Sequence, residues 1–281
     1  MYQYRRWLSS TLYHGFVLVL AFIVIYPVLW LVASSFKTQP EIFQSAHSLI
    51  PKSLHVENYA IGWRGFGRHT FGVFFRNSFY ITILSTLGQV ISSALVAYGF
   101  SRIRFVGRNF WFTCMILTML LPGQVLMIPQ YVMFNKLGWV NTHKPLIIPA
   151  FFGTPFFVFL LMQFIRGIPL ELDESAKIDG CGRYGIFLRI ILPNLKPPLV
   201  TAAIFAFYWK WEDFLGPLIY LQSTRLYPVS LALKLFADPA AVTNWGGMFA
   251  MSVLSLVPVF VIFVLFQDHI VEGISTTGLK G

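Results

Sequence analysis

The chain has 281 residues, of which 56% are hydrophobic and 11% are Asp, Glu, Lys or Arg, less than half the charged share of an ordinary soluble domain. This composition excludes a disordered chain and argues against a water-soluble globule. The net charge of +10 comes without an arginine-rich run interleaved with aromatic residues, so nucleic-acid binding is not indicated.

Five stretches contain no Asp, Glu, Lys or Arg, and each is long enough to cross a membrane. A helix rising 1.5 Å per residue needs roughly 20 residues to cross about 30 Å of hydrocarbon. The stretches are 7–36, 77–101, 109–135, 145–165 and 239–267. The first exceeds the roughly 7–15 apolar residues of a secretory signal, so we expect it to be retained as a helix over about 12–35.

The next helices are expected over about 77–100, 109–135 and 145–165. A loop of about 40 residues precedes them, and Arg102, Arg104 and Arg108 lie in the short loop after the first of the three. Pro122 and Pro129 predict a kink inside the 109–135 helix.

The polar segment 166–189 gathers four of the eleven acidic residues. A helix is expected from Leu170 to Asp179, because Glu171, Asp173 and Glu174 complement the positive end of a helix dipole. Gly180 suits the left-handed stop that ends such a helix. A helix this short and charged would lie at the membrane surface and offer a rigid knob to a partner, although an ordinary solvated connection explains the same pattern.

A sixth crossing helix is expected over about 197–219, beginning near Pro197, where proline is tolerated in a first turn. The last helix is expected over about 246–267. Six crossings put both termini on one side of the membrane. Lys and Arg are divided almost equally between the two sides, and only the loop 102–108 favours a cytoplasmic location for the termini.

One motif in the polar segment has a known counterpart. It consists of Glu174-Ser175-Ala176, Gly180 and the run 190–193, Ile-Ile-Leu-Pro. It resembles the EAA loop of the membrane subunits of ATP-binding-cassette importers, with Ser175 in place of the usual middle alanine. Both residues are small.

Further matches point to the carbohydrate subgroup, specifically to maltose-transporter-like second permease subunits. They cover nearly the whole chain: Glu57-Asn58-Tyr59, Asn77-Ser78, Asp179-Gly180, Trp211 to Leu218, and Gly278-Leu279-Lys280-Gly281.

The resemblance implies one all-α permease domain over 1–281, with the type I ABC importer fold. It implies six transmembrane helices, a short cytoplasmic coupling helix between helices 4 and 5, and a coupling loop over 166–189. In this family the EAA helix docks on a separate ATPase. The residues expected to couple are Glu174, Ser175, Ala176, Asp179, Gly180, Leu279, Lys280 and Gly281. Glu174 would be the anchoring carboxylate, Ala176 the small contact residue and Gly180 the turn; helix capping alone also explains Glu174, and a frayed end explains the tail.

The chain has no G-x-x-x-x-G-K-[ST] loop, so this phosphate-binding motif is absent from it. The resemblance implies a transport subunit without enzymatic activity, cofactor or metal, and ATP-Mg on a cytoplasmic ATPase dimer. It also implies a second homologous permease subunit, an extracytoplasmic solute-binding protein, and a prokaryotic cytoplasmic membrane with both termini in the cytoplasm.

A sugar site is mostly apolar with a few placed polar groups and aromatic rings. The residues expected along the solute path are Gln124, Gln130, Tyr208, Trp211, Glu212 and Asp213. Interfacial or core packing equally explains the two aromatic residues, and exposure beyond the membrane equally explains the two acids. A neutral or weakly charged oligosaccharide is favoured as cargo, with a polyol or glycerol phosphate as the alternative.

Two other classes of function fit the sequence less well. An ion-coupled secondary transporter needs ionisable groups at mid-membrane, and only the 197–219 helix could supply charged ones, near one end. An intramembrane enzyme is not indicated, because the six histidines show no H-E-x-x-H or comparable spacing. Cys114 and Cys181 are too far apart in expected depth to indicate a disulfide or a zinc site.

Overall fold

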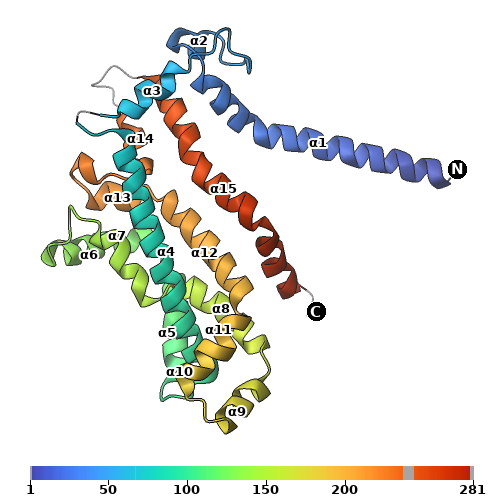
Figure 1. Cartoon of the computed structure of the whole chain (residues 1–281), viewed down its shortest axis with the longest axis vertical. Helices are drawn as coiled ribbons and strands as arrows, with labels where there is room; N and C mark the ends of the chain where they lie inside the picture. The colour runs from blue at the N-terminus through green and yellow to red at the C-terminus, as the bar shows by residue number, and fades with distance from the viewer. Residues whose placement is uncertain (1, 67, 237–243, 279–281) are drawn as a thin grey trace. The chain divides into compact units, whose positions relative to one another are not determined.

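The computed structural model describes residues 2–66, 68–236 and 244–278 (Figure 1). Within these residues the regular structure is helical, apart from one isolated bridge between Phe66 and His69. The all-α class expected from the sequence is therefore confirmed. The chain divides into two compact units, residues 1–72 with 233–257 and residues 73–232 with 258–281. The single domain expected over 1–281 stays a prediction.

The first unit contains the N-terminal helices and the beginning of the last helix. Its elements are α1 (Tyr2–Ser35), α2 (Gln39–Gln44), α3 (Glu57–Arg64) and the first part of α15 (Trp245–Gly278). Asn58 Nδ2 donates to the carbonyls of Ser35 and Lys37, both at 2.9 Å, and ties α3 to the end of α1. A Cβ added to Gly62 of α3 would lie 2.9 Å from the carbonyl oxygen of Gly247, so this close helix packing depends on glycine.

The second unit holds most of the remaining helices. Its elements are α4 (Phe71–Arg102), α5 (Arg108–Met119), α6 (Gly123–Lys136), α7 (Lys144–Ile147), η1 (Ile148–Phe152), α8 (Pro155–Gly167), α9 (Leu170–Ile178), α10 (Arg183–Ile186), η2 (Phe187–Ile191), α11 (Leu192–Asn194), α12 (Lys196–Trp211), α13 (Leu215–Tyr220), η3 (Thr224–Leu226) and the first part of α14 (Val229–Leu235). Helix α8 packs on α5 and α12. Its residues Leu161, Met162 and Ile165 are buried in a core cluster with Ala97 of α4 and Ile191 of η2.

Four helical segments are long and apolar enough to cross a membrane among the described residues. They are Ser10–Ser35, Phe71–Arg102, Lys144–Gly167 and Trp245–Gln267. Two bent helix pairs raise the number to six if each pair counts as one span. These segments agree with the expected helices over 12–35, 77–100, 145–165 and 246–267 to within a few residues, except that the second begins earlier.

The helix expected over 109–135 with a kink, and the helix expected over 197–219, are each divided in the structure. The first is broken into α5 and α6, which meet at 103°, because Pro122 disfavours helical backbone at the residue before it. The second begins at Lys196 as α12 but ends at Trp211. There the Asp213 carboxylate accepts the Gly216 N–H at 3.0 Å, a local bond that starts the separate helix α13.

The Asn77-Ser78 pair, which lies inside α4 near its N-terminal end, holds a distant loop. Asn77 is buried, and its Nδ2 donates to the carbonyls of Arg225 at 2.8 Å and Tyr227 at 3.1 Å. Ser78 Oγ accepts the Val229 N–H at 2.8 Å. The pair therefore fixes the segment 225–229 on α4.

Candidate functional site

The short helix expected at Leu170–Asp179 forms as α9, from Leu170 to Ile178. Gly180 follows it with a φ of +80°, the left-handed conformation expected at the stop. In Figure 1, α9 lies at one end of the second unit, next to α10. The chain therefore builds a projecting turn between two long helical segments.

Helix α9 has one buried and one exposed face. Two of its side chains, Asp173 and Ala176, are buried. Ala176 belongs to the core cluster that also contains Tyr98 and Ile186. Packing within the chain thus explains its small size, and the contact with a partner expected for it stays a prediction.

The exposed face of α9 and its turn carries most of the expected coupling residues. Glu174, Ser175, Asp179 and Gly180 are all exposed. Apolar side chains stand beside them, since Ile178 is 88% exposed and Tyr184 is 81% exposed. Exposed apolar groups of this size next to charged ones are typical of a docking surface. Leu279, Lys280 and Gly281 lie outside the described residues.

A second candidate site is a cavity of about 340 Å³ between α6, α7 with η1, and the α12–α13 junction. Three of the six expected path residues, Gln124, Gln130 and Asp213, line it. The full lining is Gly123, Gln124, Met127, Gln130, Phe134, Pro145, Leu146, Pro149, Lys210, Asp213, Leu215, Gly216 and Tyr220. The cavity is therefore largely apolar, with a few amide, hydroxyl and charged groups.

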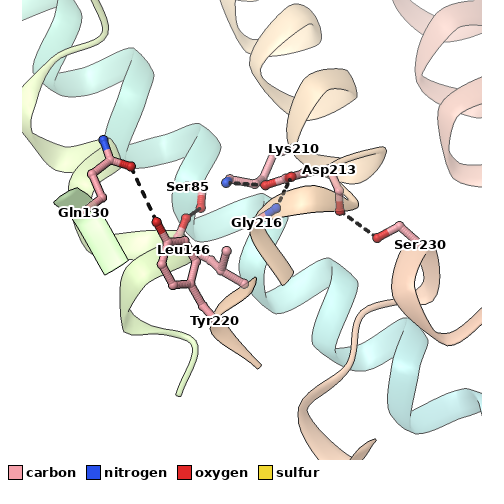
Figure 2. Close-up of polar contacts among 8 residues, drawn as sticks. All are labelled: Ser85, Gln130, Leu146, Lys210, Asp213, Gly216, Tyr220 and Ser230. Carbon is pink, nitrogen blue, oxygen red and sulfur yellow. Dashed lines mark hydrogen bonds and ion pairs between the residues drawn. The ribbon is translucent and has the colours of Figure 1, made fainter. Parts of the chain in front are cut away.

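The charges in this cavity are paired. Lys210 Nζ lies 3.1 Å from Asp213 Oδ2, and the second carboxylate oxygen accepts the Gly216 N–H. Ser230 Oγ donates to the Asp213 carbonyl at 2.8 Å, as Figure 2 shows. Asp213 thus holds the α12–α13 junction together, and its carboxylate neutralises the one lysine among the lining residues.

Gln130 and Tyr220, which both line the cavity, point toward each other (Figure 2). The Tyr220 hydroxyl donates to Gln130 Oε1 at 3.5 Å, and its ring packs edge-on against Phe134 at 5.4 Å. Burial raises the pKa of the Tyr220 hydroxyl, and the Asp213 carboxylate raises it further, so the hydroxyl stays protonated as a donor. Ser85 Oγ of α4 donates to the Leu146 carbonyl of α7 at 3.0 Å, and this bond holds α7 on α4.

The other three expected path residues are not among those lining this cavity. Trp211 is buried and stacks on Phe207 at 5.6 Å, which fits the packing alternative. Tyr208 and Glu212 are exposed. Their place on a solute path stays a prediction.

Sequence reasoning did not place Lys210, Tyr220 or the segment 145–149 in the site. Lys210 stands three residues before Asp213, a spacing that would indicate an ion pair on one face of the helix expected over 197–219. No local pattern marks the other two, because they meet the cavity only through the folding of α7 and α13 against α6. Among the described residues, no three His, Cys, Asp or Glu side chains gather in an arrangement that could hold a metal.

Comparison with known proteins gives consistent matches over most of the chain. Residues 89–276 match the family described as binding-protein-dependent transport system inner membrane component. The arabinooligosaccharides transport system permease protein AraQ of Halalkalibacterium halodurans is 33% identical over 276 residues, covering 98% of this chain and 97% of that protein. The trehalose/maltose transport system permease protein MalG of Thermococcus litoralis is 32% identical, covering 94% of each chain.

The fold also has a solved counterpart. A chain in the crystal structure of a bacterial ABC transporter involved in the import of the acidic polysaccharide alginate aligns with a TM-score of 0.81 and 18% identity. The alignment covers 92% of this chain and 95% of the other.

Proposed function

Since the chain belongs to the family of binding-protein-dependent transport system inner membrane components, we propose that it forms a transport path for a sugar together with a second, homologous permease subunit. A separate cytoplasmic ATPase dimer binds and hydrolyses ATP-Mg, and an extracytoplasmic solute-binding protein delivers the solute. The absence of the phosphate-binding loop from these 281 residues agrees with ATP hydrolysis on another subunit.

The single observation that carries the coupling proposal is the two-faced helix α9. Its inner face is fixed in the protein, while Glu174 and Ile178 stand free on the outside. A cleft in the ATPase can pair with the carboxylate and cover the apolar side chain. Movement of the ATPase then reaches the membrane helices through a rigid element.

The proposed topology has six crossings, with each bent helix pair forming one, and both termini in the cytoplasm. Arg102, at the end of α4, forms an ion pair with Asp173 of α9, so the loop 102–108 and the α9 loop lie at the same end of the second unit. That short loop carries three arginines, and basic short loops favour the cytoplasmic side. A cytoplasmic ATPase can reach α9 only in this orientation.

We assign the solute path to the cavity that contains Gln124, Gln130 and Tyr220. Amide and hydroxyl groups suit the hydroxyls of a neutral oligosaccharide, and the pairing of Lys210 with Asp213 leaves no net charge for an acidic solute. Of the alternatives, a glycerol phosphate would draw on Lys210 after its release from Asp213, whereas a neutral polyol would use the same amide and hydroxyl groups as a sugar. The names of the two relatives, which refer to arabinooligosaccharides and to trehalose and maltose, agree with a sugar.

Reconstitution into proteoliposomes tests the proposal. The chain alone is expected neither to hydrolyse ATP nor to take up solute, and the complete set of subunits is expected to do both. Unlabelled arabinose oligosaccharides are expected to reduce the uptake of a labelled sugar by competition. Glycerol phosphate is expected to leave that uptake unchanged. Solute uptake by the chain alone, driven by a proton or sodium gradient, would contradict the proposal.

A further inference from the structure

The end of α4 is attached to the inner face of α9 by a buried ion pair. Arg102 Nε lies 3.4 Å from Asp173 Oδ2, and the two side chains are only 5% and 6% exposed. The same guanidinium donates through one of its terminal nitrogens to the carbonyls of Ile165, at 3.0 Å, and Ile168. One side chain therefore joins α4, the end of α8 and α9.

A second contact from α4 reaches the other end of the α9 loop. Tyr98 lies one turn before Arg102, is buried, and donates through its hydroxyl to the Arg183 carbonyl at 3.1 Å. Arg183 opens α10, the element that follows the loop. The last turn of α4 thus contacts the segment that enters the loop and the segment that leaves it.

Asp173 provides the ion pair that holds α9 against the rest of the second unit. Of the nine residues of this helix, only Asp173 and Ala176 are buried, and the alanine contributes a single methyl group. Leu170 and Leu172 are both exposed, so hydrophobic packing does little to hold the helix. Separating a buried arginine from its carboxylate leaves an uncompensated charge in a poorly solvated place, which strongly opposes separation.

We propose that Arg102 and Asp173 form a positioning pair that makes α9 and the end of α4 move as one body during transport. The pair is distinct from the ATPase-docking face, because its members point inward while Glu174 and Ile178 point outward. The inference rests on the proposed function, since it concerns how a movement imposed on α9 passes into a membrane-spanning helix. It predicts that loss of the pair lowers solute uptake per ATP hydrolysed while the ATPase still binds.

A double-mutant cycle in the complete reconstituted transporter tests this prediction. The variants are R102Q, D173N and R102Q/D173N, with E171Q as the control that removes an exposed carboxylate from the same helix. Each single variant is expected to lower uptake per ATP about tenfold, and the double variant is expected to stay within about twofold of the lower single variant, because both changes break one contact. ATPase co-purification and the E171Q ratio are expected to match the wild type.

Three results of the cycle would overturn the inference. The single variants could keep the wild-type ratio, the double variant could regain it, or the two losses could multiply as for independent sites. Failure of the proposed function looks different, because the wild-type chain itself would then neither bind an ATPase nor support uptake.

A distance measurement on the intact pair decides the question even if the variants do not assemble. Spin labels at Leu95→Cys on α4 and Lys177→Cys on α9 use two exposed positions, with Cys114 and Cys181 replaced by serine. One rigid body predicts a distance that changes by less than about 2 Å between the nucleotide-free and ATP-bound transporter, and any larger change would refute it.

Discussion

Ile178 is the most exposed apolar residue of α9, with 88% of its surface open to solvent. If the ATPase covers this side chain, its burial contributes about 1.5–3 kcal/mol to docking. That free energy corresponds to roughly 10- to 150-fold in affinity. Ile178→Ser removes most of the apolar surface and is therefore expected to raise the Kd for the ATPase by at least about tenfold.

The assay is titration of purified ATPase onto the permease pair in lipid nanodiscs. Ile50→Ser is a matched control, because Ile50 is 81% exposed and lies between α2 and α3, in a region that the proposed topology places outside the cell. The control is expected to bind the ATPase with wild-type affinity. An unchanged Kd for Ile178→Ser, or an equal loss in both variants, would refute docking through α9.

Three further predictions concern the turn after α9, the cavity and the loop held on α4. Nothing lies within 4 Å of a Cβ added to Gly180, so only the left-handed backbone opposes a side chain there. Gly180→Ala is therefore expected to lower the thermal unfolding midpoint through a backbone cost of about 1 kcal/mol, and Gly180→Asn is expected to lower it less, because asparagine adopts this conformation more readily. Equal losses would argue against the backbone explanation. Gln130→Ala is expected to raise the KM for uptake about tenfold through a lost hydrogen bond, and the exposed Gln222→Ala is expected to leave it unchanged; matching effects would remove Gln130 from the path. Asn77→Ala leaves two backbone carbonyls unpaired and is expected to cost about 1–3 kcal/mol in unfolding experiments, with the exposed Asn109→Ala near zero; a stable Asn77 variant would show that the loop is held by other contacts.

Local signals explain what could be predicted from the sequence. Helix α9 was predictable because a short acidic segment precedes a glycine, and both the dipole and the left-handed stop act within a few residues. Most long apolar segments were predictable for the same reason, since charge-free length is a local property. Pro122 predicted a kink, but its 103° angle depends on how the chain packs.

Contacts between distant residues account for the rest. Nothing near Asp173 in the sequence distinguishes it from the other acids of α9. Its partner Arg102 lies at the end of α4, and the helices α5 to α8 separate the two residues along the chain. The end of α12 at Trp211 was missed because the apolar residues resume after Asp213, and only the fold shows that this carboxylate starts a new helix. The cavity gained Tyr220 in the same way, through the packing of α13 beside α6 and α7.

The sharp break between α5 and α6 has a consequence for how the protein is made. Helix ends leave backbone carbonyl and N–H groups without partners in the helix, and hydrocarbon cannot satisfy them. Leu120 and Leu121, at the break, are exposed in the isolated chain. In the proposed topology this break needs protein to cover it, and we expect a copy expressed without its proposed partner subunit to be degraded faster than one expressed with it.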